Sequence, residues 1–242
     1  MKQIFLILLI FTVFIKCDDV TKQEKFKKEV VVNFVLYADS LKQKALLSYT
    51  QKIDEGMTSN QFINNIAPID YAEFYINNIK LQNISTDSLK NNNKCYSNFP
   101  LITECFNYFT EDSNAILQDK NNLQIKVDNK IITGTTIIPG NFSIKLNHKK
   151  LSWSSSSDAF IYRISATAIN EDLVQPFEET TFDTTITLNI KDFKPDTYKI
   201  TVEALDKNLF NFLIKENFHA GLQNAFGVFG SVRIKKIKKK ID

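Results

Sequence analysis

The stretch DFKPDTYKITVEAL runs from Asp192 to Leu205. It begins with a turn that contains Pro195 and continues with the pattern of a β-strand. Pro195 has a fixed φ and no N–H to donate to a strand ladder, so it suits the turn that leads into the strand. Beyond Tyr198, apolar and polar residues alternate, which is typical of a strand with one buried face. The predicted buried face carries the side chains of Ile200, Val202 and Ala204.

Four more strand patterns precede this stretch, and all of them follow Pro139-Gly140, a dipeptide that marks a domain boundary. A turn at Asn147-His148 separates the first two of these strands. The four predicted strands are Phe142–Leu146, Lys149–Trp153, Ala159–Ala168 and Thr184–Ile190. Short strands separated by turns indicate an all-β domain that begins at residue 139.

This half of the chain resembles a fibronectin type III domain. The residues that carry the resemblance are Leu151-Ser-Trp153, Tyr162-Arg-Ile164 and Phe193-Lys-Pro-Asp-Thr-Tyr198. The resemblance covers residues 139–206 and implies a Greek-key β-sandwich. In such a fold one tryptophan fills the space between the two sheets, and a tyrosine at a corner bonds back to the backbone. The expected core residues are Trp153, Tyr162 and Tyr198.

The C-terminal stretch departs from that family. From Leu205 to His219 the apolar residues recur at helical spacing, which predicts a short amphipathic helix; a strand at residues 208–213 is the alternative. Gly221 and Gly227 bracket a predicted loop, and Val228–Ile234 is the predicted last strand. The second domain with this C-terminal extension therefore spans residues 139–242.

The last strand ends in a basic run, Arg233–Lys240. A run of this kind can contact phosphates or anionic lipid, but the favoured interpretation is a solvated end that keeps a terminal strand soluble. The formal net charge is only +3, and no basic stripe interleaved with aromatic residues occurs elsewhere. The sequence therefore predicts no nucleic-acid partner.

The sequence pattern of the N-terminal half also indicates β-structure, and we expect a β-sandwich domain over residues 29–138. Asp70–Asn77 alternates with Ala72, Phe74 and Ile76 on one face, as a half-buried strand does. Asp128-Asn129 is a predicted hairpin turn. The predicted strands are Glu29–Tyr37, Lys44–Thr50, Asp70–Asn77, Ile79–Ile84, Asn122–Val127 and Lys130–Ile138. The predicted fold class is all-β: two β-sandwich modules, the second fibronectin type III/Ig-like, with a short helix near the C-terminus.

The first 19 residues, MKQIFLILLIFTVFIKCDD, predict export. About a dozen apolar residues follow Lys2, which suits a signal-peptide core and is shorter than the roughly 20 residues that span a bilayer. Cys17 stands where a cleavage site would be, followed by acidic residues. This resembles a bacterial lipoprotein signal, which implies lipidation of Cys17, a signal peptide over residues 1–17 and a tether over residues 18–28. Ordinary secretion with Cys17 lost or incidental, and an uncleaved membrane anchor, are the alternatives.

The chain has three cysteines, and lipidation of Cys17 would leave Cys95 and Cys105 as a pair. In an exported protein such a pair can form a disulfide. Closing a segment of this length stabilises a fold by about 3 kcal/mol in the loop-entropy model. Two free buried thiols are the alternative.

Residues for catalysis or metal binding are sparse. His148 and His219 are the only histidines, and neither has a partner at zinc-ligand spacing, so we expect no metal and no cofactor. No phosphate-binding glycine loop or nucleophile elbow occurs. A weak calcium candidate is the acidic group Glu171, Asp172, Glu178, Glu179 and Asp183, which is otherwise a solvated loop.

The order of features along nearly the whole chain resembles Bacteroidota lipoproteins of domain-of-unknown-function family 4249. The carrying motifs are Thr133-Gly-Thr-Thr-Ile-Ile-Pro139 and Gly227-Val-Phe-Gly230. The resemblance implies a cell-envelope β-protein without assigning it an activity.

These observations predict a non-catalytic, lipid-anchored cell-envelope protein that binds or scaffolds at the outer membrane, with a link to nutrient uptake as one form of that role. Its predicted partners are the membrane, through the N-terminal lipid, and an envelope protein. The predicted location is the bacterial outer membrane, facing the periplasm or the surface, or else the secreted fraction. The alternative function is a secreted carbohydrate-active or other hydrolase built on a β-sandwich, whose carboxylate pair the fold would have to bring together.

Overall fold

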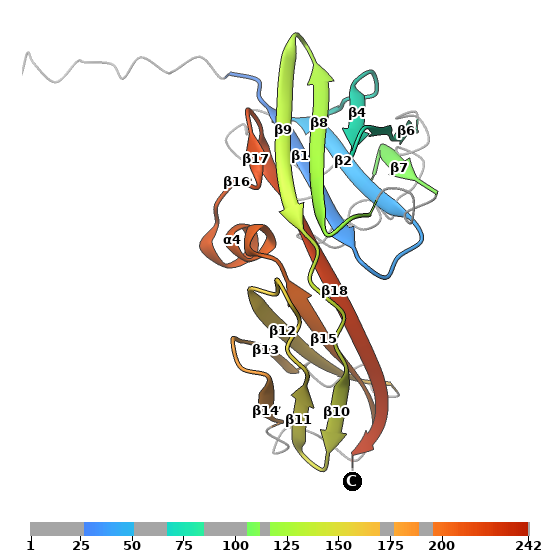
Figure 1. Ribbon diagram of the computed structural model, residues 1–242, viewed down its shortest axis with the longest axis vertical. Coiled ribbons are helices and arrows are strands. Elements are labelled where there is room, and N and C mark those ends of the chain that lie inside the picture. The colour runs from blue at the N-terminus through green and yellow to red at the C-terminus, as the bar shows by residue number, and fades with distance from the viewer. Residues whose placement is uncertain are drawn as a thin grey trace, which may run out of the picture.

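The computed structural model describes residues 27–50, 67–84, 106–111, 117–169, 177–188 and 196–241. In these residues the chain forms two β-sandwiches stacked end to end along the long axis, with one short helix beside their junction (Figure 1). The predicted all-β class with two sandwich modules, the second of them fibronectin-like, is confirmed.

The upper sandwich packs a five-stranded sheet against half of a ten-stranded sheet. The five-stranded sheet has the order β17 (Leu222–Gln223), β9 (Lys130–Ile137), β8 (Lys120–Val127), β4 (Glu73–Ile76) and β5 (Ile79–Lys80). The facing half contains β1 (Val30–Tyr37), β2 (Gln43–Tyr49), β3 (Ala67–Pro68), β6 (Gln82–Asn83), β7 (Tyr108–Thr110), β16 (His219–Ala220) and the start of β18 (Phe226–Ile241).

The lower sandwich packs the other half of the ten-stranded sheet against a three-stranded sheet. The ten-stranded sheet contributes β13 (Phe177–Thr181), β12 (Ile161–Ala168), β15 (Asp196–Leu205) and the end of β18. The three-stranded sheet has the order β10 (Ile144–Asn147), β11 (Lys150–Trp153) and β14 (Thr185–Thr187).

One strand, β18, belongs to both sandwiches. From Phe226 to Val232 it runs parallel to β1, and from Val232 to Ile241 it runs antiparallel to β15. A strand of 16 residues extends about 50 Å, which is longer than one sandwich. The structure therefore differs from the predicted domain boundary at residue 138. The first sandwich includes β17 and the first half of β18, although both lie in the segment predicted to form the second domain.

Aromatic rings fill the centre of the upper sandwich. Phe34 on β1 lies 5.5 Å from Phe74 on β4 and 5.5 Å from Phe229 on β18, measured between ring centroids. Tyr108 on β7 lies 5.1 Å from Phe74. Side chains at alternate positions of β1 are buried, as a strand with one face on the core requires; they are Val30, Val32, Phe34 and Leu36.

In the lower sandwich Trp153 on β11, Tyr162 on β12 and Tyr198 on β15 are all buried in one apolar cluster. The Trp153 and Tyr162 ring centroids are 5.3 Å apart. The Tyr162 hydroxyl accepts a hydrogen bond of 2.8 Å from the backbone N–H of Ser156. The rings thus contact across the sandwich, because β11 and β12 belong to opposite sheets.

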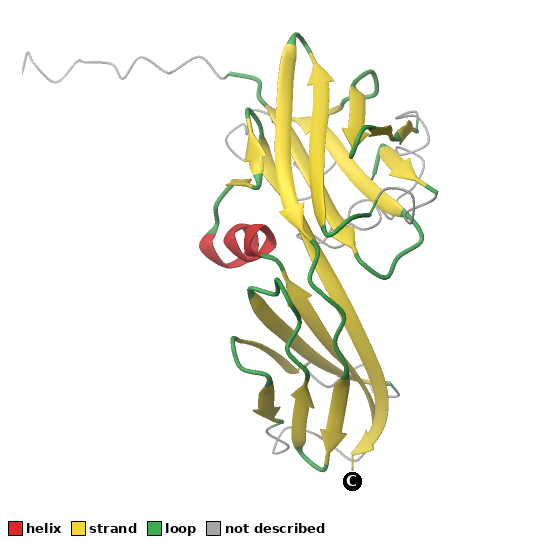
Figure 2. Ribbon diagram, in the orientation of Figure 1, coloured by secondary structure: helices red, strands yellow, loops and turns green. Residues whose placement is uncertain are grey.

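The helix α4 (Lys207–Lys215) lies against the outer face of the ten-stranded sheet, where the two sandwiches meet (Figure 2). Asp206 caps its N-terminus by accepting a hydrogen bond from the Leu209 N–H, and Glu216 ends it in a left-handed conformation. Leu209 and Phe210 face the sheet. The alternative of a strand at residues 208–213 is wrong, because the spacing of the apolar residues is that of one helix face.

Two hairpin turns show how side-chain chemistry sets the register. Asp128 and Asn129 both have positive φ, 48° and 58°, which matches the twist of the β8–β9 hairpin. In the β10–β11 hairpin Asn147 pairs with Lys150, so the turn is His148-Lys149, one residue later than expected. His148, with φ 50°, takes the left-handed position.

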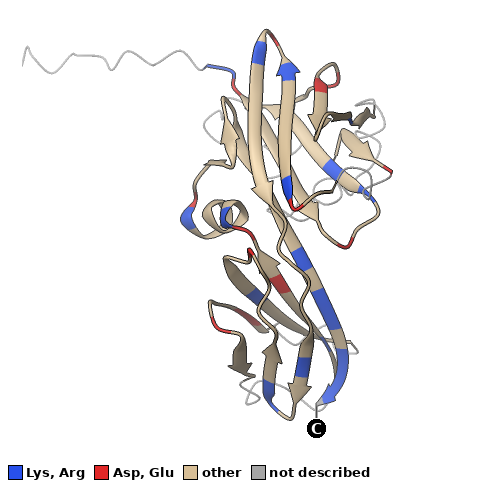
Figure 3. Cartoon of the chain, in the orientation of Figure 1, with Lys and Arg blue, Asp and Glu red and all other residues tan. Residues whose placement is uncertain are grey.

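The basic run predicted as a solvated end forms the lower part of β18 (Figure 3). Beyond Val232 the strand pairs with β15 on one side, and among the described residues no strand pairs with its other side. Lysines along such an edge disfavour pairing with another chain. Arg233, at the start of this run, binds the Asp39 carboxylate at 2.8 Å and the Pro139 carbonyl oxygen at 2.7 Å.

Candidate functional site

The outer face of the five-stranded sheet carries a continuous row of polar, uncharged side chains. Strand register places Tyr75 on β4 beside Gln124 on β8, Gln124 beside Thr133 on β9, and Thr133 beside Gln223 on β17. The row crosses four strands at one level, and β8 and β9 form the middle of it (Figure 1). Their core-facing neighbours Leu123, Ile125 and Ile132 are buried, so the row faces outward.

A second row lies one step along the same face. Asn122 on β8 is opposite Thr135 on β9. Asn77, in the β4–β5 turn, donates its backbone N–H to the Asn122 carbonyl oxygen at 2.9 Å. Asn208 on α4 reaches the other end of the row, where its amide donates to the Thr135 carbonyl oxygen at 2.7 Å. The two rows together make a surface of carboxamides and hydroxyls.

The two rows line a groove of about 590 Å³. Its six carboxamides are Asn77, Asn78, Asn122, Gln124, Asn208 and Gln223. Three hydroxyl side chains, Tyr75, Thr133 and Thr135, lie among them. Among the described residues, no Asp, Glu, Lys or Arg contributes to this lining.

The floor of the groove depends on two glycines. A Cβ on Gly134 of β9 would lie 2.5 Å from the Gly221 carbonyl oxygen, and Gly221 itself has φ 72°. Glycine at both positions therefore lets β17 lie against β9, which places Gln223 at the end of the first row.

Some groove side chains are already held by the protein. Asn77 donates to Asn121 Oδ1 at 2.9 Å and accepts from the Asn122 N–H at 2.8 Å. Thr133 donates to Gln223 Oε1 at 3.0 Å. By contrast, the side chains of Tyr75, Asn122 and Gln124 have no hydrogen-bond partner among the described residues. The groove thus presents a fixed frame with unengaged polar groups at its centre.

The chemistry of the groove suits binding. A carboxamide both donates and accepts hydrogen bonds, and a hydroxyl does the same. The one titratable imidazole, His219, is engaged: its Nδ1 donates to the Ala225 carbonyl oxygen at 2.8 Å, and its ring centroid lies 4.5 Å from that of Phe226. The part of the lining that the structure describes contains no pair of carboxylates of the kind that glycoside cleavage uses.

A charged cluster lies beyond one end of the groove, where β1 begins. Glu29 binds Lys27 at 2.6 Å and Lys130 at 2.9 Å. The hydrogen bonds from Lys27 and then Lys130 lower the pKa of the Glu29 carboxyl to about 2. These groups, with His219 and Phe226, line a separate hollow of about 470 Å³.

The tip of the β8–β9 hairpin holds a second polar cluster. The hydroxyls of Tyr49 and Tyr71 both donate to the Asp128 carboxylate, and these hydrogen bonds lower the pKa of Asp128. The Lys28 ammonium lies 3.5 Å from the centroid of the Tyr49 ring. The two tyrosine hydroxyls satisfy the Asp128 carboxylate, and the bond from Tyr49 ties the hairpin tip to β2.

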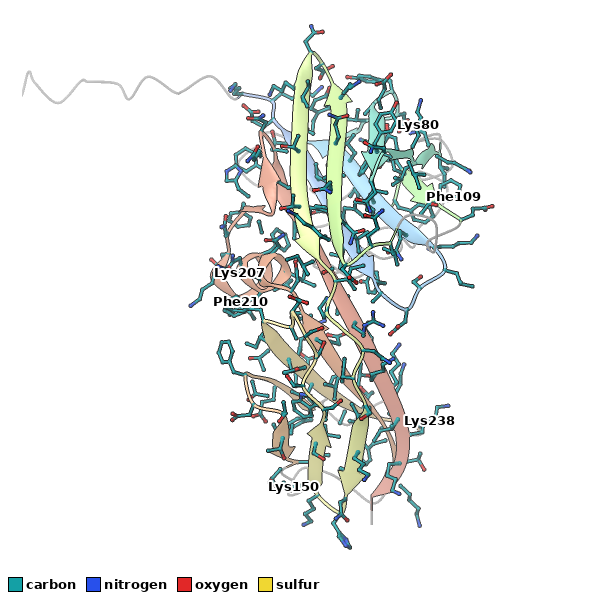
Figure 4. The ribbon with its side chains drawn as sticks, in the orientation of Figure 1. Lys80, Phe109, Lys150, Lys207, Phe210 and Lys238 are labelled. Atoms are coloured by element: carbon teal, nitrogen blue, oxygen red, sulfur yellow. The ribbon has the colours of Figure 1, made fainter. Side chains whose placement is uncertain are left out.

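Aromatic rings also gather where α4 meets the lower sandwich. Phe160 lies 4.7 Å from Phe210 and 5.9 Å from Phe182, between ring centroids. Figure 4 labels Phe210 on the helix, close to the lower sandwich. These rings attach the helix to the lower module.

Five of the site residues predicted from sequence lie outside the described residues: Cys17, Cys95, Cys105, Glu171 and Asp172. The remaining members of the calcium candidate are Glu178 and Glu179 on β13 and Asp183 after it. Adjacent residues of a strand point to opposite faces, so Glu178 and Glu179 do not converge. Across the described ranges, no group of three His, Cys, Asp or Glu side chains is placed to hold a metal.

Within the same ranges, no helix has the length and hydropathy needed to cross a membrane. A scan against protein-family models and a search of curated proteins gave no match. Among solved structures, the chain is similar to the crystal structure of domains A168-A170 from titin, with 10% identity and a TM-score of 0.23. The match covers 86% of this chain and 65% of the titin chain, so less than two thirds of the latter.

The sequence contained part of the signal for the groove. Alternation in Asn122–Val127 places Asn122 and Gln124 on the solvent face, and alternation in Asp70–Asn77 does the same for Tyr75. These residues are polar without charge, whereas solvent faces of sheets commonly carry charges. Which residues lie beside them across the sheet depends on strand order, and sequence pattern does not contain that information.

Proposed function

We propose that this chain is a non-catalytic binding protein of the bacterial cell envelope, lipid-anchored at the outer membrane through Cys17. The groove on the five-stranded sheet is its binding surface. The observation that carries the proposal is the described lining of the groove, which presents unengaged amides and hydroxyls in a fixed frame. Uptake of a nutrient by an envelope complex is one process that such a protein would serve.

The position of the first described residues supports this arrangement. Glu29 binds Lys130 at the β8–β9 turn end of the upper sandwich, and Lys27 binds Glu29. A tether over residues 18–28 spans at most about 40 Å when fully extended. An anchor at Cys17 would therefore hold the upper sandwich, with its groove, next to the membrane and leave the basic end of β18 farther away.

Labelling with radioactive palmitate tests the anchor. We expect the full-length wild-type protein, produced in a Bacteroidota host, to incorporate label and to stay with the outer-membrane fraction. Stable membrane attachment needs more than one acyl chain, since a single chain binds a bilayer with a constant on the order of 10⁴ M⁻¹. Cys17→Ala should lose the label and move to the soluble exported fraction.

The matched controls are Cys95→Ala and Cys105→Ala, which should keep the label. The proposal is wrong if the wild type takes up no palmitate. It is also wrong if Cys17→Ala retains the label.

A further inference from the structure

We propose that the groove binds a neutral oligosaccharide, laid across β4, β8, β9 and β17. This inference rests on the proposed function and names the ligand class for the same surface. Its basis is the row formed by Tyr75, Gln124, Thr133 and Gln223, together with Asn122 beside it.

The hydrogen-bonding groups match those of a sugar. Each sugar hydroxyl donates one hydrogen bond and accepts others, so it pairs best with a side chain that also does both. Carboxamides and hydroxyls have this property, whereas carboxylates only accept and ammonium groups only donate. Asn122 and Gln124 have no partner within the described part of the chain, so both groups of each amide are available to a ligand.

The groove also has an aromatic side chain of the required kind. Tyr75 is half-buried at one end of the row, and its ring lies on the outer face of β4. Such a ring offers an apolar face to the C–H groups of a pyranose, while its hydroxyl stays available for a hydrogen bond. The ring and the adjacent Gln124 amide lie on the same face of the sheet, so both can contact one sugar unit.

The dimensions favour a chain of several sugar units. Neighbouring strands lie about 4.8 Å apart, so the row from β4 to β17 is about 14 Å long. A ligand laid along the row would therefore meet one polar side chain on each of the four strands, so the row suits a chain of several sugar units and not a single one. The volume of about 590 Å³ is that of an ordinary small-ligand site.

The described lining residues include no Asp, Glu, Lys or Arg, which favours a neutral ligand. A charged ligand loses hydration on entering a groove and needs an opposite charge to compensate. The six carboxamides provide none. The nearby Lys27, Glu29 and Lys130 are outside the groove lining, and Glu29 is paired with both lysines, which leaves one net positive charge there. Sulfated or uronic-acid chains are therefore expected to bind poorly.

The main chain argues against a peptide as the occupant. Extended peptides usually bind at a sheet edge, where unpaired N–H and C=O groups are available. The centre of the groove is a sheet face, and both edges of β8 and of β9 are already paired, with β4 and β17 on the outside. A peptide could bond to side-chain amides here, but it could not add a strand through main-chain hydrogen bonds.

The test is isothermal titration of the full-length protein with neutral hexasaccharides up to about 10 mM, well past the Kd of a millimolar site. The probes are the α-1,4-glucan, β-1,4-glucan, β-1,4-mannan and β-1,4-xylan hexamers. A heparin hexasaccharide and a ten-residue Gly/Ser/Thr peptide serve as anionic and peptide probes. We expect measurable binding of at least one neutral hexamer and tighter binding of hexamer than of the corresponding monosaccharide.

Variants of groove residues test whether the saccharide binds in the groove. Each neutral hydrogen bond that is lost weakens binding about 2- to 10-fold, so Asn122→Ala combined with Gln124→Met should raise the Kd at least about tenfold. Tyr75→Ala should raise it by a similar factor. Lys120→Ala, on the same strand and face but outside the groove lining, should leave the Kd unchanged. Circular dichroism melts establish that all variants fold.

The inference is overturned if no neutral hexamer binds, if the peptide or heparin binds more tightly, or if the groove variants bind as the wild type does. A protein that binds no saccharide but incorporates palmitate at Cys17 would refute this inference and leave the anchor in place. A protein that binds saccharide without Cys17-dependent label would do the reverse.

Discussion

A fragment that ends at Ile138 is expected not to fold, although it contains the whole of the predicted N-terminal domain. The upper sandwich needs the first half of β18, which runs between β1 and β16 from residues near the C-terminus. It also needs β17, which closes one edge of the five-stranded sheet. Fragment 27–138 lacks both strands.

The size of the expected effect follows from what β18 contributes to the core. Phe229 is fully buried and stacks on Phe34. Loss of one such ring alone costs about 3–5 kcal/mol. The fragment would lose in addition the ladder from Val31 to Tyr37 along one side of β1. Since a domain of this kind is stable by only about 5–15 kcal/mol, these losses together exceed the available margin.

The measurement is the dispersion of amide signals in an NMR spectrum and the cooperativity of a thermal melt. The matched control joins residues 27–138 to residues 220–232 through a flexible Gly/Ser linker of about 15 residues. This fusion restores β17 and the upper half of β18 and should fold. A cooperative melt of fragment 27–138 without those residues would show that the upper sandwich is complete without β18.

Sequence pattern predicted those elements whose signal is local. The β8–β9 hairpin has alternation on its first strand and Asp128-Asn129 at the turn, and the two strands pair in the structure as predicted. The buried face of β4, with Ala72, Phe74 and Ile76, is also the predicted one. Such predictions succeed because burial on one face imposes a period of two on the strand itself.

Elements without a local signal were not predictable in this way. β17 has only two residues, Leu222 and Gln223, which are too few to show a period. The sequence predicted a loop between Gly221 and Gly227. The parallel pairing of β18 with β1 joins residues about 195 positions apart, as Val31 and Phe226 show. The groove depends on both facts, because Gln223 comes from β17 and the position of β17 depends on β18.

The mutation Asp206→Ala is expected to be the most destabilising single substitution among those that leave the aromatic cores intact. Asp206 is buried at the junction of the two sandwiches, between the end of β15 and the start of α4. Its carboxylate accepts from the Leu209 N–H at 2.8 Å, the Ser231 N–H at 3.1 Å and the Thr136 hydroxyl at 2.6 Å. One side chain thus joins the helix to β18 and β9.

Removing that carboxylate leaves the Ser231 N–H as a buried donor without its acceptor and uncaps the helix, whereas the Thr136 hydroxyl can still donate to the Ser231 hydroxyl at 3.2 Å. An orphaned buried donor costs about 1–3 kcal/mol, and a lost N-cap costs about 1 kcal/mol. We therefore expect Asp206→Ala to lower the free energy of unfolding by about 2–4 kcal/mol in urea denaturation. Lys207→Ala, at the adjacent and exposed position, should change it by less than about 0.5 kcal/mol.

The isosteric variant Asp206→Asn separates hydrogen bonding from charge. Its carbonyl oxygen can still accept from Leu209 and Ser231, so the cost at pH 7 should be about 1–2 kcal/mol. In the wild type, burial raises the pKa of Asp206 above its ordinary value of 3.8, although the hydrogen bonds from Thr136, Leu209 and Ser231 oppose the shift. A carboxyl whose pKa is higher in the folded than in the unfolded state takes up a proton more readily when folded.

The contribution of Asp206 to stability is therefore greatest below the unfolded-state pKa and declines as the pH rises through the folded-state pKa. Because asparagine does not titrate, the difference in free energy of unfolding between wild type and Asp206→Asn isolates this effect. We expect the wild type to gain stability relative to the variant as the pH falls from 7 to 4. A difference that shrinks over that interval would mean that the three hydrogen bonds outweigh burial, and that Asp206 joins the two sandwiches as a carboxylate with a lowered pKa.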